Sequence, residues 1–210
     1  MSTKRIYFVR HAESHMNAQG LLHQYEEGPL SDYGIEQAQA LARRFQNISV
    51  DLIVSSPYER AKATSAVIMD VVQAPVEYSD LLKEFGGPKE LEGKAKNDPE
   101  VIKINKIMTE NRNDPHWRYS DEETAHELIT RATKAVAMLE ELNANAVICV
   151  THGLFLRILV GVMMFGEKLD RDYLLKFMRF ISISNTGVTV CEHQEERWKL
   201  ITLNDMAHLN

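Results

Sequence analysis

Two arginines and two histidines stand where the chain leaves short apolar runs. Arg10 and His11 directly follow the first run. Arg60 follows the second run after a short serine and proline segment, and His152 follows the most apolar run. Guanidinium groups are fork-shaped donors that suit phosphate oxygens, and a neutral imidazole can attack phosphorus. These residue types predict a phosphate site in which one histidine is the nucleophile and the other donates to phosphate oxygens.

The elements that must position these side chains follow from hydrophobic periodicity. Short apolar runs alternate with longer helical patterns, which is typical of a parallel sheet with crossover helices. Helices are expected at about 35–45, preceded by an N-cap at Ser31 or Asp32, and at 58–72, 100–109, 125–139 and after 153. Strands are expected at 6–9, 51–54, 76–78 and 146–150, and hairpin strands within 180–203 that turn at 185–187. The predicted fold class is α/β, a three-layer α/β/α architecture with a mostly parallel central sheet and an antiparallel C-terminal edge.

The predicted topology brings the four side chains together. In open α/β sheets, ligands bind outside the carboxyl ends of the strands, where loops lead into helices. Arg10, His11, Arg60 and His152 all lie at such ends, beside helix N-termini whose free N–H groups favour anions. We therefore expect a single anion pocket, and arginines that neutralise phosphate charge remove the need for a metal or another cofactor.

Composition bounds the class of protein. The 210 residues are enough for one domain with a full core, and 24 Lys and Arg against 30 Asp and Glu give a formal charge of −6. This acidity disfavours nucleic-acid and anionic-membrane partners. Cys149 and Cys191 lie in apolar or β-branched runs and are expected to be reduced. With no signal-peptide core and no membrane-spanning stretch, a cytoplasmic protein is expected.

Residues 83–121 interrupt the regular alternation. The segment contains Gly-Gly-Pro and two Asp-Pro pairs, which predict loops around one short helix. We expect a single domain over residues 1–210, with a small cap insertion at about 83–121 that lies over the site and selects the leaving group.

The motifs, taken in order, identify a family. The matching pieces are residues 10–17; residues 29–31 with Gly34, Gln37 and Ala38; residues 55–56 with Arg60, Ala61 and Thr64; residues 82–84 with Gly86, Glu92 and Gly93; and His152-Gly153 with Arg157. From Arg5 to about Asn185 the sequence resembles the histidine phosphatase superfamily, the phosphoglycerate-mutase-like group, and within it the phosphatase branch.

The resemblance implies a phosphohistidine mechanism. His11 would take the phosphoryl group, and Glu84 would be the general acid that protonates the leaving alkoxide and later the base that activates water. Glu90 and Glu92 lie close by in the sequence and are alternatives for the acid.

The resemblance also implies a phosphate-binding set. Arg10, Arg60 and the catalytic His152 would hold the phosphate, with Asn17 and the Gly153 backbone as secondary contacts. The expected partner is a phosphorylated small molecule, and either a monomer or a homodimer is compatible with the sequence. The remaining histidines are interpreted as surface residues or outer substrate contacts: His15, His23, His116, His126, His193 and His208.

Departures from the family pattern shape the alternatives. Ala12 stands where the family usually has glycine, which requires a backbone without positive φ. Met16 stands where mutases commonly have tryptophan, and a long basic insertion is missing, so hydrolysis is favoured over a phosphoglycerate mutase reaction. A further alternative is an inactive homologue that only binds phosphorylated ligands. A metal hydrolase using His11, His15 and His152 is the least favoured hypothesis.

Overall fold

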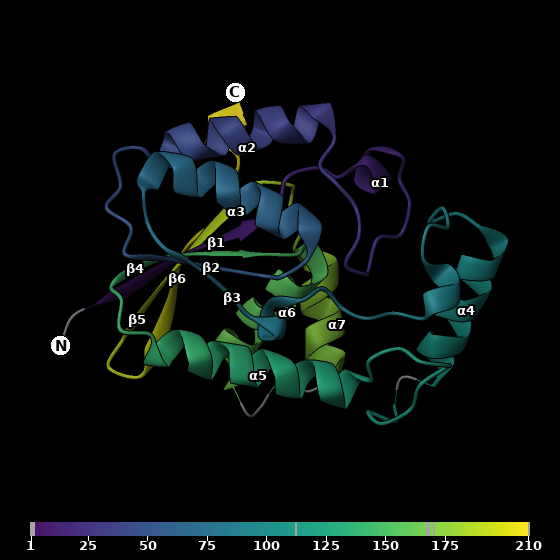
Figure 1. Cartoon of the computed structure of the whole chain (residues 1–210). Helices are drawn as coiled ribbons and strands as arrows, with labels where there is room; N and C mark the ends of the chain where they lie inside the picture. The colour runs from purple at the N-terminus through teal and green to yellow at the C-terminus, as the bar shows by residue number, and fades with distance from the viewer. Residues whose placement is uncertain (1–2, 112, 167–168, 170, 210) are drawn as a thin grey trace.

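A six-stranded mixed sheet forms the centre of the protein (Figure 1). The computed structural model describes residues 3–111, 113–166, 169 and 171–209. The spatial order of the strands is β3-β2-β4-β1-β5-β6. The strands are β1 (Lys4–Arg10), β2 (Leu52–Ser55), β3 (Val76–Tyr78), β4 (Ala146–Thr151), β5 (Val188–Gln194) and β6 (Arg197–Asp205). The pairs among β1 to β4 are parallel, whereas β1–β5 and β5–β6 are antiparallel, so the predicted fold class is confirmed.

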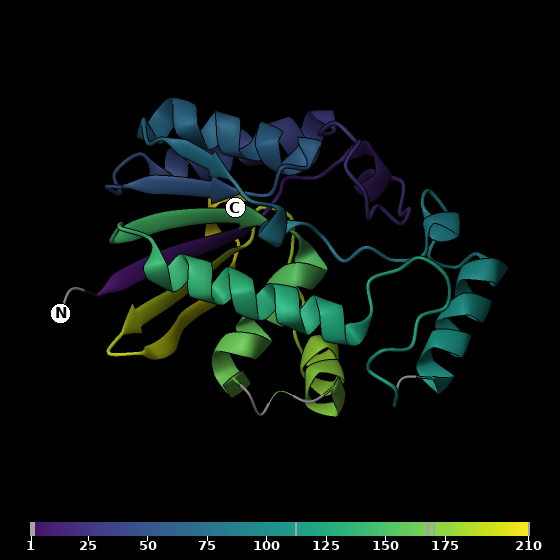
Figure 2. The same ribbon diagram turned by 60° about the horizontal axis from the view of Figure 1, so that its bottom comes forward.

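Helices cover both faces of this sheet (Figure 2). Helices α2 and α3 lie on one face, and α5 and α6 lie on the other with α7 packed against α6. The helices are α1 (His15–Ala18), α2 (Asp32–Phe45), α3 (Glu59–Val72), α4 (Pro99–Glu110), α5 (Ala125–Glu141), α6 (Gly153–Phe165) and α7 (Arg171–Phe180). Short 3-10 helices are η1 (Asp80–Leu82), η2 (Lys89–Leu91) and η4 (Ala207–Leu209).

Alternation along the strands divides the core into two layers. Successive side chains of a strand point to opposite faces. Phe8 and Cys149 therefore pack in the core beneath α5 and α6, whereas their neighbours Val9 and Ile148 pack in the core beneath α2 and α3. Burial on both faces explains why β1 and β4 read as continuous apolar runs.

Capping residues explain where the helices begin. The Ser31 hydroxyl accepts a hydrogen bond from the N–H of Gly34 at the start of α2. At the start of α5, Thr124 and Glu127 form a reciprocal capping box. These side chains satisfy N–H groups that have no partner inside the helix. The predicted α2 boundary and the start of α5 are accordingly confirmed.

The C-terminal hairpin differs from its prediction. The chain turns between β5 and β6 at Glu195 and Glu196, which both have positive φ (52° and 58°), and not at residues 185–187. The Asn185 segment instead returns the chain from α7 to the carboxyl end of β1, where the Thr186 N–H donates to the Arg10 carbonyl over 2.9 Å. Helix α7 was also missing from the prediction.

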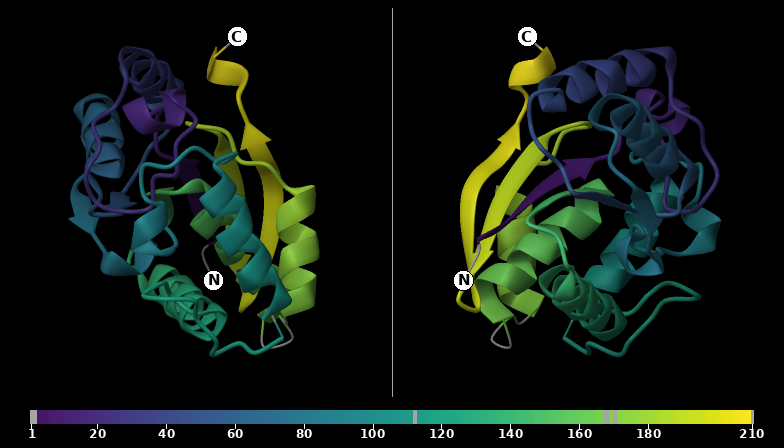
Figure 3. Two further views of the ribbon diagram at one scale, coloured as in Figure 1. Left: turned by 90° about the vertical axis from the view of Figure 1, so that its right-hand side faces the viewer. Right: turned by 60° about the vertical axis from the view of Figure 1, so that its left-hand side comes forward.

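The cap segment, residues 83–121, carries η2 and α4 and extends beyond the sheet (Figures 1 and 3). Leu91, Val101 and Ile104 form a small buried cluster of their own. Leu22, on the loop after α1, joins the cap to the rest of the chain because its N–H donates to the Lys94 carbonyl over 2.9 Å. No helix of the described residues has the length and apolar character needed to cross a membrane.

Candidate active site

A cavity of about 300 Å³ lies at the carboxyl ends of β1 and β4. Five of the seven predicted site residues line it: Arg10, His11, Asn17, Glu84 and Gly153. The other lining residues are Leu21, Leu22, His23, Gln24, Phe85, Lys96, Leu154, Arg157, Ser182 and Ile183. Lys96 comes from the cap, so the cap contributes a cation to the same cavity. The sheet topology thus converts residues far apart in sequence into one polar pocket.

The ring of His11 is held in one orientation and one tautomer. Its Nδ1 lies 2.7 Å from the carbonyl oxygen of Ala12. A carbonyl can only accept, so Nδ1 carries the proton and Nε2 keeps its lone pair. The side chain is buried, and the backbone N–H of His11 donates to the Thr151 carbonyl over 2.9 Å. The lone pair of the His11 ring therefore lies on Nε2.

Ala12 meets the condition that its position imposes. It is not among the residues with positive φ, and its methyl group packs with Leu30 and Ala38 in a small buried cluster. Its N–H donates to Thr64 Oγ1 over 3.0 Å. The methyl group is accommodated, and the departure from the family glycine leaves the His11 backbone in place.

Arg60 and His152 flank His11 and do not line the cavity. Both are completely buried. Arg60 Nε donates to His11 Nε2 over 3.2 Å, and its Nη1 donates to the Tyr25 carbonyl over 2.6 Å. The His152 ring lies 5.1 Å from the His11 ring, and its Nε2 lies 2.8 Å from Ser56 Oγ. The structure brings both residues beside His11.

Burial and neighbouring cations keep the two histidines neutral. Burial, and after it the positive charge of Arg60, hold the pKa of His11 well below its ordinary value. The same two causes hold the pKa of His152 well below its ordinary value. Burial also lowers the pKa of Arg60, to about 10, so this guanidinium remains charged at neutral pH. A neutral imidazole beside a permanent cation suits attack on an anion.

Glu84 sits at the N-terminus of α6. Its Oε1 accepts hydrogen bonds from the N–H groups of Phe155 (2.9 Å) and Phe85 (3.0 Å), and its Oε2 accepts from the N–H of Leu154 (3.3 Å). Of the two alternative carboxylates, Glu90 is exposed and contacts Ser120. Neither Glu90 nor Glu92 lines the cavity.

The other alternative, Glu92, contacts the loop after α1, where the cap meets the rest of the chain. Its Oε2 accepts from the Gln24 N–H over 2.9 Å. Burial raises the pKa of the Glu92 carboxyl. The geometry therefore favours Glu84 over Glu92 as the carboxyl that meets a ligand.

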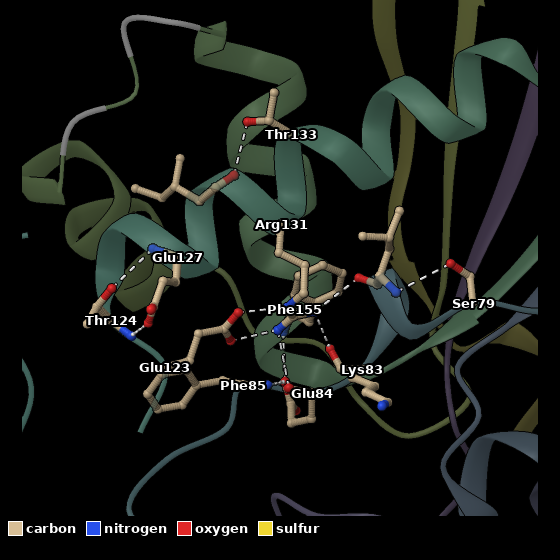
Figure 4. Close-up of polar contacts among 12 residues, drawn as sticks. Ser79, Lys83, Glu84, Phe85, Glu123, Thr124, Glu127, Arg131, Thr133 and Phe155 are labelled. Carbon is tan, nitrogen blue, oxygen red and sulfur yellow. Dashed lines mark hydrogen bonds and ion pairs between the residues drawn. The ribbon is translucent and has the colours of Figure 1, made fainter. Parts of the chain in front are cut away.

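Arg131 of α5 holds the segment that carries Glu84 (Figure 4). Its Nη1 donates to the carbonyls of Leu81 (3.0 Å) and Lys83 (2.8 Å), and its Nη2 donates to the Glu84 carbonyl (3.3 Å). Its Nε and Nη2 also form a bidentate ion pair with Glu123, over 2.7 and 2.8 Å. One guanidinium thereby fixes the backbone on the far side of the carboxylate.

The same guanidinium stacks on an aromatic ring. Its central carbon lies 4.1 Å from the centroid of the Phe155 ring. Because the Phe155 N–H donates to Glu84 Oε1, Arg131 contacts both the backbone of Glu84 and the residue that holds its carboxylate. Figure 4 shows these contacts converging on Arg131.

Gly153 permits the close approach of Arg10. A Cβ at this position would lie 3.1 Å from Arg10 Nε and 3.2 Å from Arg10 Cδ. Arg10 itself is anchored through Nη1, which donates to the Ile183 carbonyl over 2.7 Å. Among the described residues, three buried side-chain atoms have no hydrogen-bond partner: Arg10 Nε, Gln24 Oε1 and His152 Nδ1. All three belong to this site, which marks it as the place where a polar ligand is needed.

Two site residues were not identified from the sequence. Asn185 Nδ2 donates to the His11 carbonyl (2.9 Å) and to Asn17 Oδ1 (3.2 Å). His23 is buried, and its ring contacts Ser14 Oγ, Arg60 Nη1 and the Glu27 carbonyl. Of the two interpretations offered for His23, that of a surface residue was therefore wrong. Each residue joins the site through a contact that is distant in sequence, His23 with Arg60 and Asn185 with His11. The sequence marked only Asn185, as part of the turn signal at residues 185–187.

The metal-site hypothesis finds no ligand set. His15 is exposed at the start of α1, whereas His11 and His152 are buried. Within the described part of the chain, no three His, Cys, Asp or Glu side chains are grouped so that they could hold a metal ion.

Sequence comparison decides the family. The profile of the histidine phosphatase superfamily (branch 1) matches residues 6–206. The chain belongs to this superfamily. A curated relative from Hydrogenobacter thermophilus carries the provisional name phosphoserine phosphatase 2; it is 28% identical over 209 residues, which are 98% of this chain and 97% of the relative. The predicted family is thus confirmed.

Other members of the superfamily are similar over the same length. A relative from Salmonella arizonae carries the provisional name phosphoglycerate mutase and is 24% identical over 98% of this chain and 95% of its own. The crystal structure of the alpha-ribazole phosphatase from Shigella flexneri superposes with a TM-score of 0.80 and 24% identity over 96% of each chain. That likeness shows the histidine phosphatase fold.

Proposed function

We propose that the protein is a phosphomonoesterase that hydrolyses a phosphorylated small molecule through a phosphohistidine on His11. The single observation that carries this proposal is the His11 ring, which lines a cavity shared with Arg10 and Glu84 and whose Nδ1 proton is fixed on the Ala12 carbonyl, so that the lone pair lies on Nε2. In the first step Nε2 attacks phosphorus and the bond to the ester oxygen breaks. The electron pair of that bond leaves with the oxygen, and the neutral alcohol forms once a proton is supplied.

The phosphate charge is met by groups around His11. Arg10 Nε has no protein partner and is available to a phosphate oxygen. Arg60 and His152 lie beside His11 and stabilise the equatorial oxygens, with Asn17 and the Gly153 N–H as secondary contacts. Guanidinium groups supply the neutralising charge, so the proposed reaction uses no metal ion.

Glu84 is the proton donor and acceptor in this proposal. It gives its proton to the leaving oxygen in the first step. In the second step its carboxylate accepts a proton from water, the water oxygen attacks phosphorus, and the bond to Nε2 breaks with its electron pair returning to the ring. Inorganic phosphate then leaves, and both residues return to their starting protonation states.

A labelling experiment tests the nucleophile. Wild-type protein is incubated with a phosphorus-labelled ester, quenched and mapped, while phosphate release is measured in parallel for His11→Ala, Glu84→Gln and the control His15→Ala. We expect an acid-labile, alkali-stable label on His11, loss of turnover in His11→Ala, a loss of about 10²–10⁴-fold in Glu84→Gln and full activity in His15→Ala. Label on another residue contradicts the mechanism. Wild-type protein without turnover over a broad pH range makes it a phospho-ligand-binding homologue.

Transfer to a second substrate is the alternative fate of the phosphohistidine. The name of the Salmonella arizonae relative favours testing this mutase reaction, in which a sugar acid takes the phosphoryl group in place of water. The assay follows interconversion of 2- and 3-phosphoglycerate together with phosphate release, after priming with a bisphosphoglycerate. We expect phosphate release to dominate; interconversion that outpaces it overturns the phosphatase proposal.

A further inference from the structure

A second cavity, of about 340 Å³, adjoins the catalytic one. It lies between α4 of the cap on one side and the first turns of α5 and α6 and the end of α7 on the other. Its apolar lining residues are Phe85, Met108, Trp117, Ala125, Leu128, Leu154, Ile158 and Met178. The volume falls in the range of about 300–1,000 Å³ that is usual for small-molecule sites.

The two cavities share a wall that also carries Glu84. Phe85 and Leu154 line both cavities. The N–H groups of these same two residues donate to the Glu84 carboxylate, over 3.0 and 3.3 Å. An alcohol that receives a proton from Glu84 therefore stands at this wall, and the atoms beyond its oxygen lie against Phe85 and Leu154. The second cavity therefore adjoins the wall at which the leaving group of the proposed reaction stands.

Two of the three charged residues that line the second cavity, Glu122 and Glu123, have partners, and the third, Arg179, is exposed. Glu122 accepts hydrogen bonds from the N–H groups of Tyr119 and Ser120. Glu123 is paired with Arg131. Most of the remaining lining residues are apolar. The cavity accordingly suits an apolar group, which is removed from water when it binds there.

We propose that this cavity binds the apolar part of the leaving alcohol, so that the preferred substrates are monophosphate esters of alcohols bearing an aromatic or branched aliphatic group. The inference rests on the proposed phosphomonoesterase function and names its substrate class. Removing the ring from water supplies the selectivity, while the phosphate site supplies the common affinity for all esters.

Paired esters test the selectivity. Benzyl phosphate and ethyl phosphate both release a primary alcohol, so the ratio of their kcat/KM values reports recognition of the ring. We expect a ratio of at least about tenfold in wild type, because even single methylene groups in apolar pockets change kcat/KM by about 10–200-fold. Met108→Gln and Trp117→Ala reduce the ratio about tenfold. Ile102→Gln is the matched control, because Ile102 is 57% exposed on the same helix as Met108 and does not line the cavity.

A binding measurement makes the inference independent of turnover. The chain has two tryptophans, and Trp198 lies on β6, where its Nε1 donates to Glu140. In Trp198→Phe the fluorescence reports Trp117 alone. We expect benzylphosphonate, whose carbon–phosphorus bond is not hydrolysed, to change this fluorescence, and methylphosphonate at the same concentration to leave it unchanged.

The outcomes separate the two claims. Ester hydrolysis with equal benzyl and ethyl values, or with a ratio that Met108→Gln and Trp117→Ala leave unchanged, overturns the substrate class and leaves the phosphomonoesterase proposal standing. A Trp117 response to benzylphosphonate without hydrolysis of any ester supports the cavity and overturns the proposed function. Neither hydrolysis nor a fluorescence response overturns both.

Discussion

Replacing Arg131 by methionine removes the group that fixes Glu84 from behind. The substitution keeps an unbranched side chain over Phe155 but deletes five donor–acceptor contacts: two to Glu123 and one each to the carbonyls of Leu81, Lys83 and Glu84. Both members of the ion pair have side chains that are only 17% exposed. Breaking a buried pair costs about 3–5 kcal/mol, so we expect a loss of about 3 kcal/mol in the free energy of unfolding.

This destabilisation has a thermal signature. For a chain of this length each kcal/mol changes Tm by about 2–4 °C, so Tm falls by about 6–12 °C, measured by calorimetry. Arg118→Met is the control on the same side of the molecule. Arg118 forms an exposed ion pair with Glu127 of α5, and such pairs contribute less than about 1 kcal/mol.

The catalytic effect of Arg131→Met distinguishes positioning from loss of stability. General acid catalysis contributes about 10²–10⁴-fold, and a displaced Glu84 forfeits part of it, so kcat/KM for alkyl phosphates falls about 10–100-fold. Hydrolysis of p-nitrophenyl phosphate falls less than about threefold, because nitrophenolate leaves without a proton. Equal losses for the two esters at a temperature well below Tm, or the same losses in Arg118→Met, refute the reasoning.

Three further perturbations test other parts of the site. Gly153→Ala places a methyl group against Arg10 Nε, so KM for phosphate esters rises about tenfold or more in steady-state assays while Gly166→Ala, away from the cavity, leaves KM unchanged. Asn185→Ala removes two hydrogen bonds that brace the nucleophile loop and lowers kcat about tenfold at unchanged fold by circular dichroism. The folded-state pKa values of His11 and His152 are depressed, so below about pH 6.5 the unfolded chain binds more protons than the folded one. As pH is lowered through this range, the free energy of unfolding measured with urea should therefore fall by about 1.4 kcal/mol per pH unit for each histidine. The pH dependence should be smaller in His152→Gln, and equal slopes for the variant and wild type contradict the assignment.

Local patterns predicted the parts of the protein that local physics determines. The strand at β1 and its sequel Arg10-His11 could be recognised because a strand buried on both faces reads as an apolar run, and the carboxyl end of a parallel strand is where ligands bind. The α2 boundary followed from Ser31, whose hydroxyl caps the helix. These features depend on neighbours within a few residues, so sequence spacing was sufficient.

Other parts depend on contacts that no local pattern records. His23 became a site residue because the loop after α1 folds back over Arg60, and Asn185 became one because the segment after α7 returns to His11. The hairpin was misplaced because Glu195-Glu196 lacks the Asn-Gly signature of tight turns, whereas the stronger signal at 185–187 belongs to a loop. The Glu84 assignment needed the structure to separate it from Glu92, since both follow from the same stretch of sequence.

The hydrogen bond from Arg60 Nε to His11 Nε2 occupies the lone pair with which His11 would attack. A neutral electrophile that reaches the cavity meets an imidazole whose reactive nitrogen is already engaged. A phosphate ester differs, because its anionic oxygens attract the guanidinium more strongly than a neutral ring nitrogen does. The phosphate ester thus frees Nε2 of His11 by competing for the Arg60 guanidinium. In the proposed enzyme, binding of the anion and release of the His11 lone pair therefore occur together. Between turnovers the hydrogen bond from Arg60 keeps the buried imidazole from reacting.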